Sequence, residues 1–261
     1  MTFTSHPFTF APRGSLLVSM VALAIVGMTP TGALAKGIRL QYSDRVGETV
    51  RYKMTMDAGA SEFAGGQEHT STLRSEMVVS QSVVAARNGL ARVKTRVDSG
   101  SINADGQPMP VASVGQELLA DMKPTGEIVK SQSFEGLDLK GMQVVFPDRE
   151  LNPSDSWTVS IAPTPGMPVA LNVTYTVAGF EKLGSEDVVK IQASVTCDKR
   201  TAPQGFALDM KSEGEMYFSP RLGRMVKNDM RSRSSLIRTA MVGNDKMVTR
   251  ISNHIRMESL P

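Results

Sequence analysis

Residues 206–227 have the sequence FALDMKSEGEMYFSPRLGRMVK. Apolar side chains alternate at Phe206, Leu208 and Met210, and they return in the same alternation at Met216 and Phe218 after Ser212 and Gly214. Period-two alternation places these side chains on one face of an extended strand. Pro220 fixes its own φ and Gly223 takes dihedrals that other residues avoid, so the chain turns between them and a new strand begins. The stretch predicts a β-hairpin with one apolar face.

The same alternation runs through most of the chain. It is found at Val50–Met56, Leu73–Val84, Ala91–Val97, Leu171–Val177, Val189–Val195 and Met247–Met257. Turn-forming residues separate these runs at Arg87–Gly89, Asn103–Gly106, Ser219–Gly223 and Gly243–Asp245. Half-buried strands joined by short turns are typical of antiparallel sheets. We therefore expect a mainly β protein built on one curved, half-barrel-like antiparallel sheet.

Two segments depart from the strand period. Ala112–Met122 carries Val114, Leu118, Leu119 and Met122 at helical spacing, which predicts a short helix. Gly136–Val145 is a weaker case that the sequence leaves open. The expected fold therefore contains one or two short helices beside the sheet.

A short phrase occurs twice, as KPTGEIVK at residues 123–130 and as PRLGRMVK at residues 220–227. In each copy Pro precedes Gly and a strand pattern follows, so we interpret both as turns and neither as a phosphate-binding loop. The apolar alternation of residues 73–97 also recurs about 98 positions later. The repeated motif and the recurring alternation together predict two similar halves, residues 36–146 and 147–261, within one continuous sheet.

The N-terminus has the features of a secretory leader. Arg13 supplies a positive charge, Ser15–Met28 is apolar, and Ala33-Leu34-Ala35 offers small residues to a signal peptidase. We expect cleavage after Ala35 and a periplasmic or secreted product; a retained membrane anchor is the weaker interpretation, because the apolar run is shorter than a membrane span requires.

Signals of catalysis are weak. The part after Ala35 holds two histidines, His69 and His254, which are far apart and without metal-ligand spacing. Cys197 is the one cysteine, and it fits a small core residue of a strand better than a reactive thiol. No nucleophile or metalloprotease motif occurs. We expect no enzyme, no metal and no cofactor.

Methionine is the most suggestive residue type. Flexible thioethers repack around ligands of varying shape, although methionines also fill cores in which aromatic residues are scarce. Several lie at inward strand positions. The residues that we predict to contact an apolar ligand are Met54, Met56, Met77, Tyr175, Val177, Met210 and Met216.

The C-terminal quarter is basic, because residues 199–261 contain 12 Lys and Arg against 6 Asp and Glu. The outward residues Lys227, Arg231, Arg233, Arg250 and Arg256 form a candidate face for an anionic surface. The favoured alternative is a self-neutralising face, in which Glu213 lies opposite Lys227, Lys211 opposite Asp229 and Asp209 opposite Arg231. Nucleic acid is not an expected partner, because no run of exposed aromatics is present.

Three further stretches carry a resemblance: VGETVRYKM at 46–54, NPSDSWTV at 152–159 and FSPRLGRMVK at 218–227. They resemble uncharacterised exported bacterial β-rich proteins, and their strand and turn style is distantly similar to half-barrel carriers of the LolA and LprG type. The resemblance covers most of residues 40–240. It implies a curved sheet with one or two helices in its concavity and, for the carriers, an apolar ligand there. No binding residue of the carriers maps onto this chain.

Two functions remain open on this basis. The first is an envelope protein that binds a lipid-like or other apolar molecule in the concave face of its sheet. The second is a non-catalytic structural or interaction module with a packed interior. A carrier requires a cavity of about 300 Å³ or more, whereas a packed module has none.

Overall fold

The computed structural model describes residues 37–64, 67–132, 143–163, 168–239 and 246–261. The expected leader, its cleavage site after Ala35 and the expected turn at Gly243–Asp245 lie outside these residues. Most of the ambiguous segment Gly136–Val145 lies outside them as well. The following description concerns the unit Lys36–Pro261.

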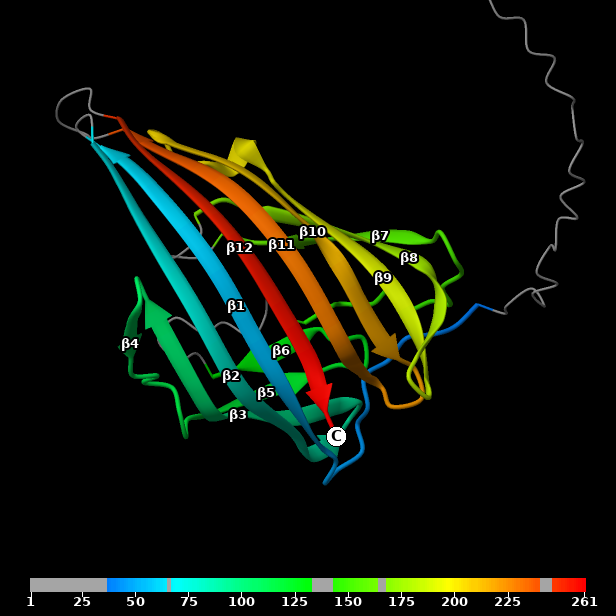
Figure 1. Cartoon of the computed structure of the whole chain (residues 1–261). Coiled ribbons are helices and arrows are strands. Elements are labelled where there is room, and N and C mark those ends of the chain that lie inside the picture. Colours follow the sequence, from blue (N-terminus) through cyan, green and yellow to red (C-terminus); the bar gives the residue numbers. More distant parts are fainter. Residues whose placement is uncertain (1–36, 65–66, 133–142, 164–167, 240–245) are drawn as a thin grey trace, which may run out of the picture. The chain divides into compact units, whose positions relative to one another are not determined.

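The described chain forms one open antiparallel sheet of 12 strands (Figure 1). The strands are β1 (Thr49–Ala64), β2 (Gln67–Arg87), β3 (Leu90–Ala104), β4 (Gln107–Met109), β5 (Glu117–Met122), β6 (Ile128–Ser131), β7 (Ser156–Ile161), β8 (Leu171–Leu183), β9 (Glu186–Cys197), β10 (Phe206–Ser219), β11 (Arg224–Thr239) and β12 (Lys246–Leu260). Their order is β6-β5-β3-β2-β1-β12-β11-β10-β9-β8-β7, and β4 pairs with β3 at one end. The mainly β class and the curved, half-barrel-like sheet are confirmed.

The first and last strands meet at the centre of the sheet. β1 pairs with β12 from Arg51 opposite Leu260 to Phe63 opposite Val248. This pairing joins the chain on both sides of Phe146 into one continuous sheet, as the sequence predicts. The duplication and the boundary between 36–146 and 147–261 stay predictions.

The helix expected at Ala112–Met122 is wrong. Residues 112–115 form a turn, and Glu117–Met122 forms β5, which pairs with β3. Leu118, Ala120 and Met122 are buried at alternate positions. The segment therefore fits both a helical and a strand spacing of apolar residues, and pairing with β3 favours the strand. Within the described residues the helical content is the 3-10 turn Lys199–Thr201.

Both copies of the repeated phrase are turns. Gly126 has φ +91° between β5 and β6, and Gly223 has φ +60° between β10 and β11. Both turns are held by the segment before β1, residues 37–48, which we call the N-terminal strap. The backbone N–H of Tyr42 donates to the carbonyl of Pro124 at 2.7 Å, and that of Ser43 donates to the carbonyl of Gly223 at 2.8 Å. The phrase therefore provides two docking points for the strap.

The main core lies over β8–β11. Leu40 of the strap and the residues Val144, Phe146 and Leu151 of the connecting segment pack against the inward side chains of these strands. The aromatic rings pack together: Phe146 lies 4.8 Å from Phe218, between ring centroids, and Trp157 stacks on Tyr175 at 5.2 Å. The aromatic residues, few as they are, gather mainly in this part of the fold.

The register predicted between β10 and β11 is wrong by four residues. Glu213 lies opposite Arg231, Lys211 opposite Arg233 and Glu215 opposite Asp229. The three predicted pairs imply a turn centred on Pro220. In the structure, Ser219 pairs with Arg224 across a four-residue connection, and the register shifts at a bulge at Tyr217/Phe218.

The acidic residues of the outer face pair in directions other than the predicted ones. Lys211 contacts Glu213 on its own strand at 3.0 Å. Glu215 pairs with Lys190 of β9 at 2.8 Å, and Asp229 pairs with His254 of β12 at 2.7 Å. Ion pairs within β10 and between neighbouring strands therefore take the place of the pairs predicted between β10 and β11.

A carboxylate joins the turn between β8 and β9 to the turn between β10 and β11. Glu186 accepts hydrogen bonds from the guanidinium of Arg221 and the hydroxyl of Ser219, and these bonds lower the pKa of Glu186. A lowered pKa stabilises the fold above the pKa of the unfolded chain, and this contribution is lost as the pH falls through the folded pKa.

Glu186→Gln is therefore expected to lower the free energy of unfolding by about 1–2 kcal/mol at pH 7. The difference from wild type should shrink below about pH 4, where the unfolded carboxyl is protonated. Urea unfolding at both pH values measures it, with Asp187→Asn as the control because the Asp187 side chain is 82% exposed. A loss that is the same at pH 7 and at acidic pH would contradict an ionic contribution.

Candidate functional site

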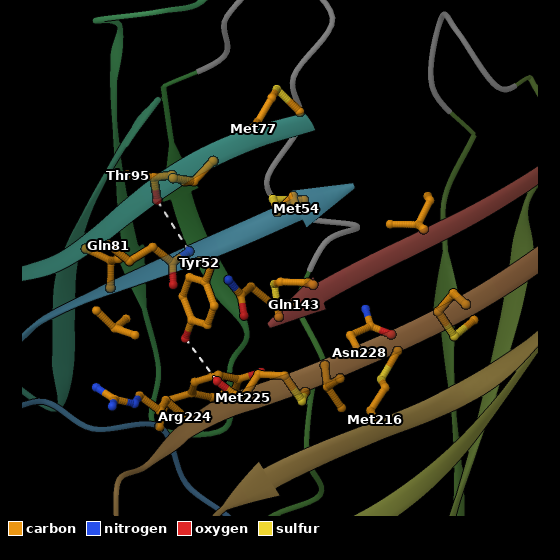
Figure 2. Close-up of a pocket in the computed structure, with 18 of the residues that line it drawn as sticks. Tyr52, Met54, Met77, Gln81, Thr95, Gln143, Met216, Arg224, Met225 and Asn228 are labelled. Atoms are coloured by element: carbon orange, nitrogen blue, oxygen red, sulfur yellow. Dashed lines mark hydrogen bonds between the residues drawn. The ribbon is translucent and has the colours of Figure 1, made fainter. Parts of the chain in front are cut away.

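The concave face of the sheet encloses a cavity of about 640 Å³ (Figure 2). Strands β1, β2, β3, β10, β11 and β12 supply most of its wall, with further residues from β5, β8 and β9. Its volume exceeds the lower bound of about 300 Å³ for a pocket that takes a small molecule. The described core layer covers β8–β11, so the cavity extends over the concave surface that this layer leaves free.

The structure brings together six of the seven residues predicted to contact a ligand. The cavity is lined by Met54, Met56, Met77, Tyr175, Met210 and Met216. Val177 does not line it, because this side chain is 1% exposed and packs within the main core. All seven side chains therefore point to the inner face of the sheet, as predicted. A side chain on this face can contact either the packed core or the cavity. Ligand contact by these residues stays a prediction.

Methionine is the most frequent residue type among the described apolar residues of the wall. Nine methionines line the cavity: Met54, Met56, Met77, Met122, Met210, Met216, Met225, Met230 and Met257. Four of them lie in one row across five neighbouring strands, since Met54 lies opposite Met77 and Met257, and Asn228 lies opposite Met257 and Met216. The flexible thioether surface suits an apolar occupant of variable shape.

Uncharged polar groups interrupt this wall. Figure 2 shows the carboxamides of Gln81, Gln143 and Asn228 facing the same space as the methionines. The Tyr52 hydroxyl donates to the carbonyl of Met225 at 3.1 Å, and the Gln81 amide donates to the Thr95 hydroxyl at 3.4 Å. The Oδ1 atom of Asn228 is buried and has no hydrogen-bond partner among the described residues. An unpaired buried acceptor costs about 1–3 kcal/mol, which a donor on a ligand would offset.

One pair of charges lines the cavity. Among its described lining residues, Glu48 of the strap and Arg224 at the start of β11 are the only acidic and basic side chains. Arg224 Nη1 lies 3.5 Å from Glu48 Oε1, and Ser43 donates to Glu48 Oε2 at 2.8 Å. The Nε atom of Arg224 is buried without a partner among the described residues. The guanidinium therefore has spare donor capacity at this end of the cavity.

The tyrosines of the cavity remain uncharged. Burial raises the pKa of Tyr175 to about 12, and burial also raises the pKa of Tyr42 and of Tyr52 well above the ordinary value. Arg224 opposes the increase at Tyr52 but does not outweigh it. All three hydroxyls stay protonated at neutral pH, so the cavity offers donors rather than phenolates.

The basic residues of the outer face are partly compensated. Lys227 pairs with Glu258 at 3.5 Å, and Arg256 pairs with Asp57 at 2.8 Å. Arg231, Arg233 and Arg250 are exposed beside these pairs. Exposed pairs of this kind contribute little to stability. Contact with an anionic surface stays a prediction for this face.

The other residues singled out in the sequence lie apart from the cavity. Cys197 is half-buried, and burial raises the pKa of its thiol. His69 lies exposed on β2, and His254 contacts Asp229. In the described ranges, no three His, Cys, Asp or Glu side chains cluster as a metal site would require. The same ranges contain no helix of the length and apolarity that crosses a membrane.

Comparisons with known proteins give weak structural likenesses. No protein-family model and no curated protein matches the chain. Among solved structures, lipovitellin, in a structure of its lipid–protein interactions, is similar with a TM-score of 0.49 and 8% identity, over 84% of this chain and 26% of lipovitellin. This chain thus spans about a quarter of the lipovitellin chain.

Two bacterial structures are similar over nearly their whole length, with lower TM-scores than lipovitellin. A protein with a YmcC-like fold from Bacteroides fragilis has a TM-score of 0.25 and 8% identity, over 82% of this chain and 98% of its own. An outer membrane channel from Pseudomonas putida F1 has a TM-score of 0.22 and 9% identity, over 84% and 98%. At these scores the likenesses carry no argument about function, and the resemblance to LolA- and LprG-type carriers stays an expectation.

The sequence did not identify the polar part of the cavity. Glu48 and Arg224 both occur in stretches interpreted as strand entries and turns, and Gln81, Gln143 and Asn228 carry no motif. Strand parity does place Gln81 and Asn228 inward, beside Val79 and Met230, so an inward polar residue in an apolar strand was the available signal.

Proposed function

We propose that the protein is an exported, non-catalytic carrier that holds a lipid-like or other apolar molecule in the concave face of its sheet. The cavity of about 640 Å³ carries the proposal. A structural or interaction module would fill this space with side chains, because protein interiors pack densely. Here the space is lined by methionines that can adapt to an occupant.

The sequence of the leader supports export. A charged n-region, an apolar run and Ala33-Leu34-Ala35 favour translocation and cleavage after Ala35, which would place the carrier in the periplasm or outside the cell. Carriage of an apolar molecule through an aqueous compartment requires that its apolar surface be shielded from water. An open sheet with an apolar concave face would supply that shielding.

Native mass spectrometry of the protein purified from its own envelope fraction tests the proposal. A carrier is expected to retain a co-purifying lipid-sized mass that denaturation releases. Consistent absence of such a mass, together with failure to bind any apolar probe, would favour the packed-module alternative.

The double variant Met54→Gln/Met257→Gln is expected to bind the uncharged dye N-phenyl-1-naphthylamine at least about tenfold more weakly than wild type. The two side chains are cross-strand neighbours on the cavity wall. Carboxamides have similar size but retain their water in the free protein, so burying an apolar dye against them is less favourable. Fluorescence titration measures the affinity.

Met109→Gln is the matched control, because Met109 lies on β4 outside the cavity and is 52% exposed. Its affinity should equal that of wild type. Equal affinities for the double variant and the control would place the dye elsewhere on the protein.

A further inference from the structure

We propose that the Glu48–Arg224 end of the cavity binds the head group of a zwitterionic amphiphile, with the anionic group at Arg224, the cationic group at Glu48 and the acyl chain along the methionine wall. The inference rests on the proposed carrier function and specifies its ligand class. Glu48 and Arg224 are the acidic and basic side chains of the described lining, and both lie at one end of the cavity.

The geometry leaves both charges available to a ligand. Arg224 Nη1 lies 3.5 Å from Glu48 Oε1, farther than in a normal charge-assisted hydrogen bond of about 2.7–2.9 Å. Arg224 Nε is buried and unpaired in the described structure. Both side chains are about three-quarters shielded from solvent, at 24% and 25% exposure, so water satisfies them only in part.

Each of the other ligand classes leaves one of these groups unmatched. A purely anionic head group beside Arg224 would also lie close to the Glu48 carboxylate and be repelled by it. An uncharged head group would form only hydrogen bonds without a charge of its own, which are weaker than the bonds between two charged groups. A zwitterion presents opposite charges a short distance apart, as this site does, and pairs with both residues at once.

The surroundings fit a head group at this end and a chain beyond it. Ser43 lines the cavity beside the charged pair, and its hydroxyl donates to Glu48. Along β11 from Arg224, the inward residues change to Met225, Asn228 and Met230. Among the described lining residues, charge is therefore confined to the strap end, as the charges of an amphiphile are confined to its head group.

Three single-chain probes with the same 12-carbon acyl group test the inference: lysophosphatidylethanolamine, which is zwitterionic, lysophosphatidylglycerol, which is anionic, and monododecanoylglycerol, which is uncharged. Binding to the delipidated protein is measured by calorimetry below the critical micelle concentrations. Wild type is expected to prefer the zwitterion over the anion by about tenfold, since that factor corresponds to one well-placed charge interaction.

Arg224→Met should weaken both phospholipids about tenfold and leave the monoacylglycerol unchanged, whereas Glu48→Gln should reverse the order of zwitterion and anion. Arg51→Met and Glu76→Gln are the matched controls, because both side chains lie on the outer face with more than half of their surface exposed. These controls should retain the wild-type order. Thermal unfolding by circular dichroism confirms that each variant is folded.

The outcomes separate the head-group site from the carrier function. If wild type binds all three probes within about twofold of one another, or if Glu48→Gln keeps the wild-type order, the head-group site is overturned while the carrier stands. If wild type binds none of the three probes, the head-group inference and its carrier basis both fail.

Discussion

Replacing Phe218 with Ala is expected to lower the free energy of unfolding by about 3–5 kcal/mol, the range for removing a fully buried aromatic side chain. Phe218 is 0% exposed on β10. Its ring meets Phe146 edge-on at 4.8 Å and Tyr42 at 5.3 Å, between centroids. The deletion would therefore leave a cavity where the sheet, the connecting segment and the strap converge.

Urea unfolding followed by Trp157 fluorescence measures this loss. Trp157 is the only tryptophan of the chain, and its ring contacts Phe146 at 6.1 Å, so its signal reports on the same cluster. Phe180→Ala is the matched control, because Phe180 lies on β8 and is 41% exposed. The control should cost less than about 1 kcal/mol. Similar losses for the two variants would show that the aromatic cluster does not dominate the core.

Which side chains of a strand point inward could be predicted from the sequence, because this alternation is a local property of each strand. Val173, Tyr175 and Met216 point inward as expected, since a strand with one apolar face has one favourable orientation on a sheet. The turns at Asn88-Gly89 and Asp105-Gly106 also follow from their residues, and all four adopt positive φ in the structure. These features need no knowledge of distant segments.

Register and polar contacts could not be predicted, because they depend on how strands meet. Glu213 does not lie opposite Lys227, because β10 and β11 are joined by a four-residue connection and their pairing contains a bulge. No residue type in the sequence indicates either feature. Glu48 and Arg224 are distant in sequence, and the strap brings them together by docking Ser43 on Gly223. The division between core and cavity, which separates Val177 from Tyr175, depends likewise on the segment around Phe146.

Gly126→Ala is expected to lower the free energy of unfolding by about 2–4 kcal/mol, through backbone strain and a steric clash together. Gly126 has φ +91°, a region that residues with a Cβ avoid. An added Cβ would lie 2.3 Å from the carbonyl oxygen of Val144 and 2.5 Å from the ring of Tyr42. Relief of the clash requires both the backbone at Val144 and the strap at Tyr42 to move away from the turn.

Gly106→Ala separates the two causes, because Gly106 has φ +81° with nothing within 4 Å of an added Cβ. Backbone strain alone should cost about 1–2 kcal/mol there. Hydrogen exchange adds a local readout: in Gly126→Ala the amide of Tyr42 should lose protection as its bond to Pro124 breaks, while the amide of Ser43, bonded to Gly223, keeps more of it. Equal stability losses in the two variants, with Tyr42 still protected, would mean that the turn tolerates a methyl group and that the strap is not clamped between Gly126 and Gly223.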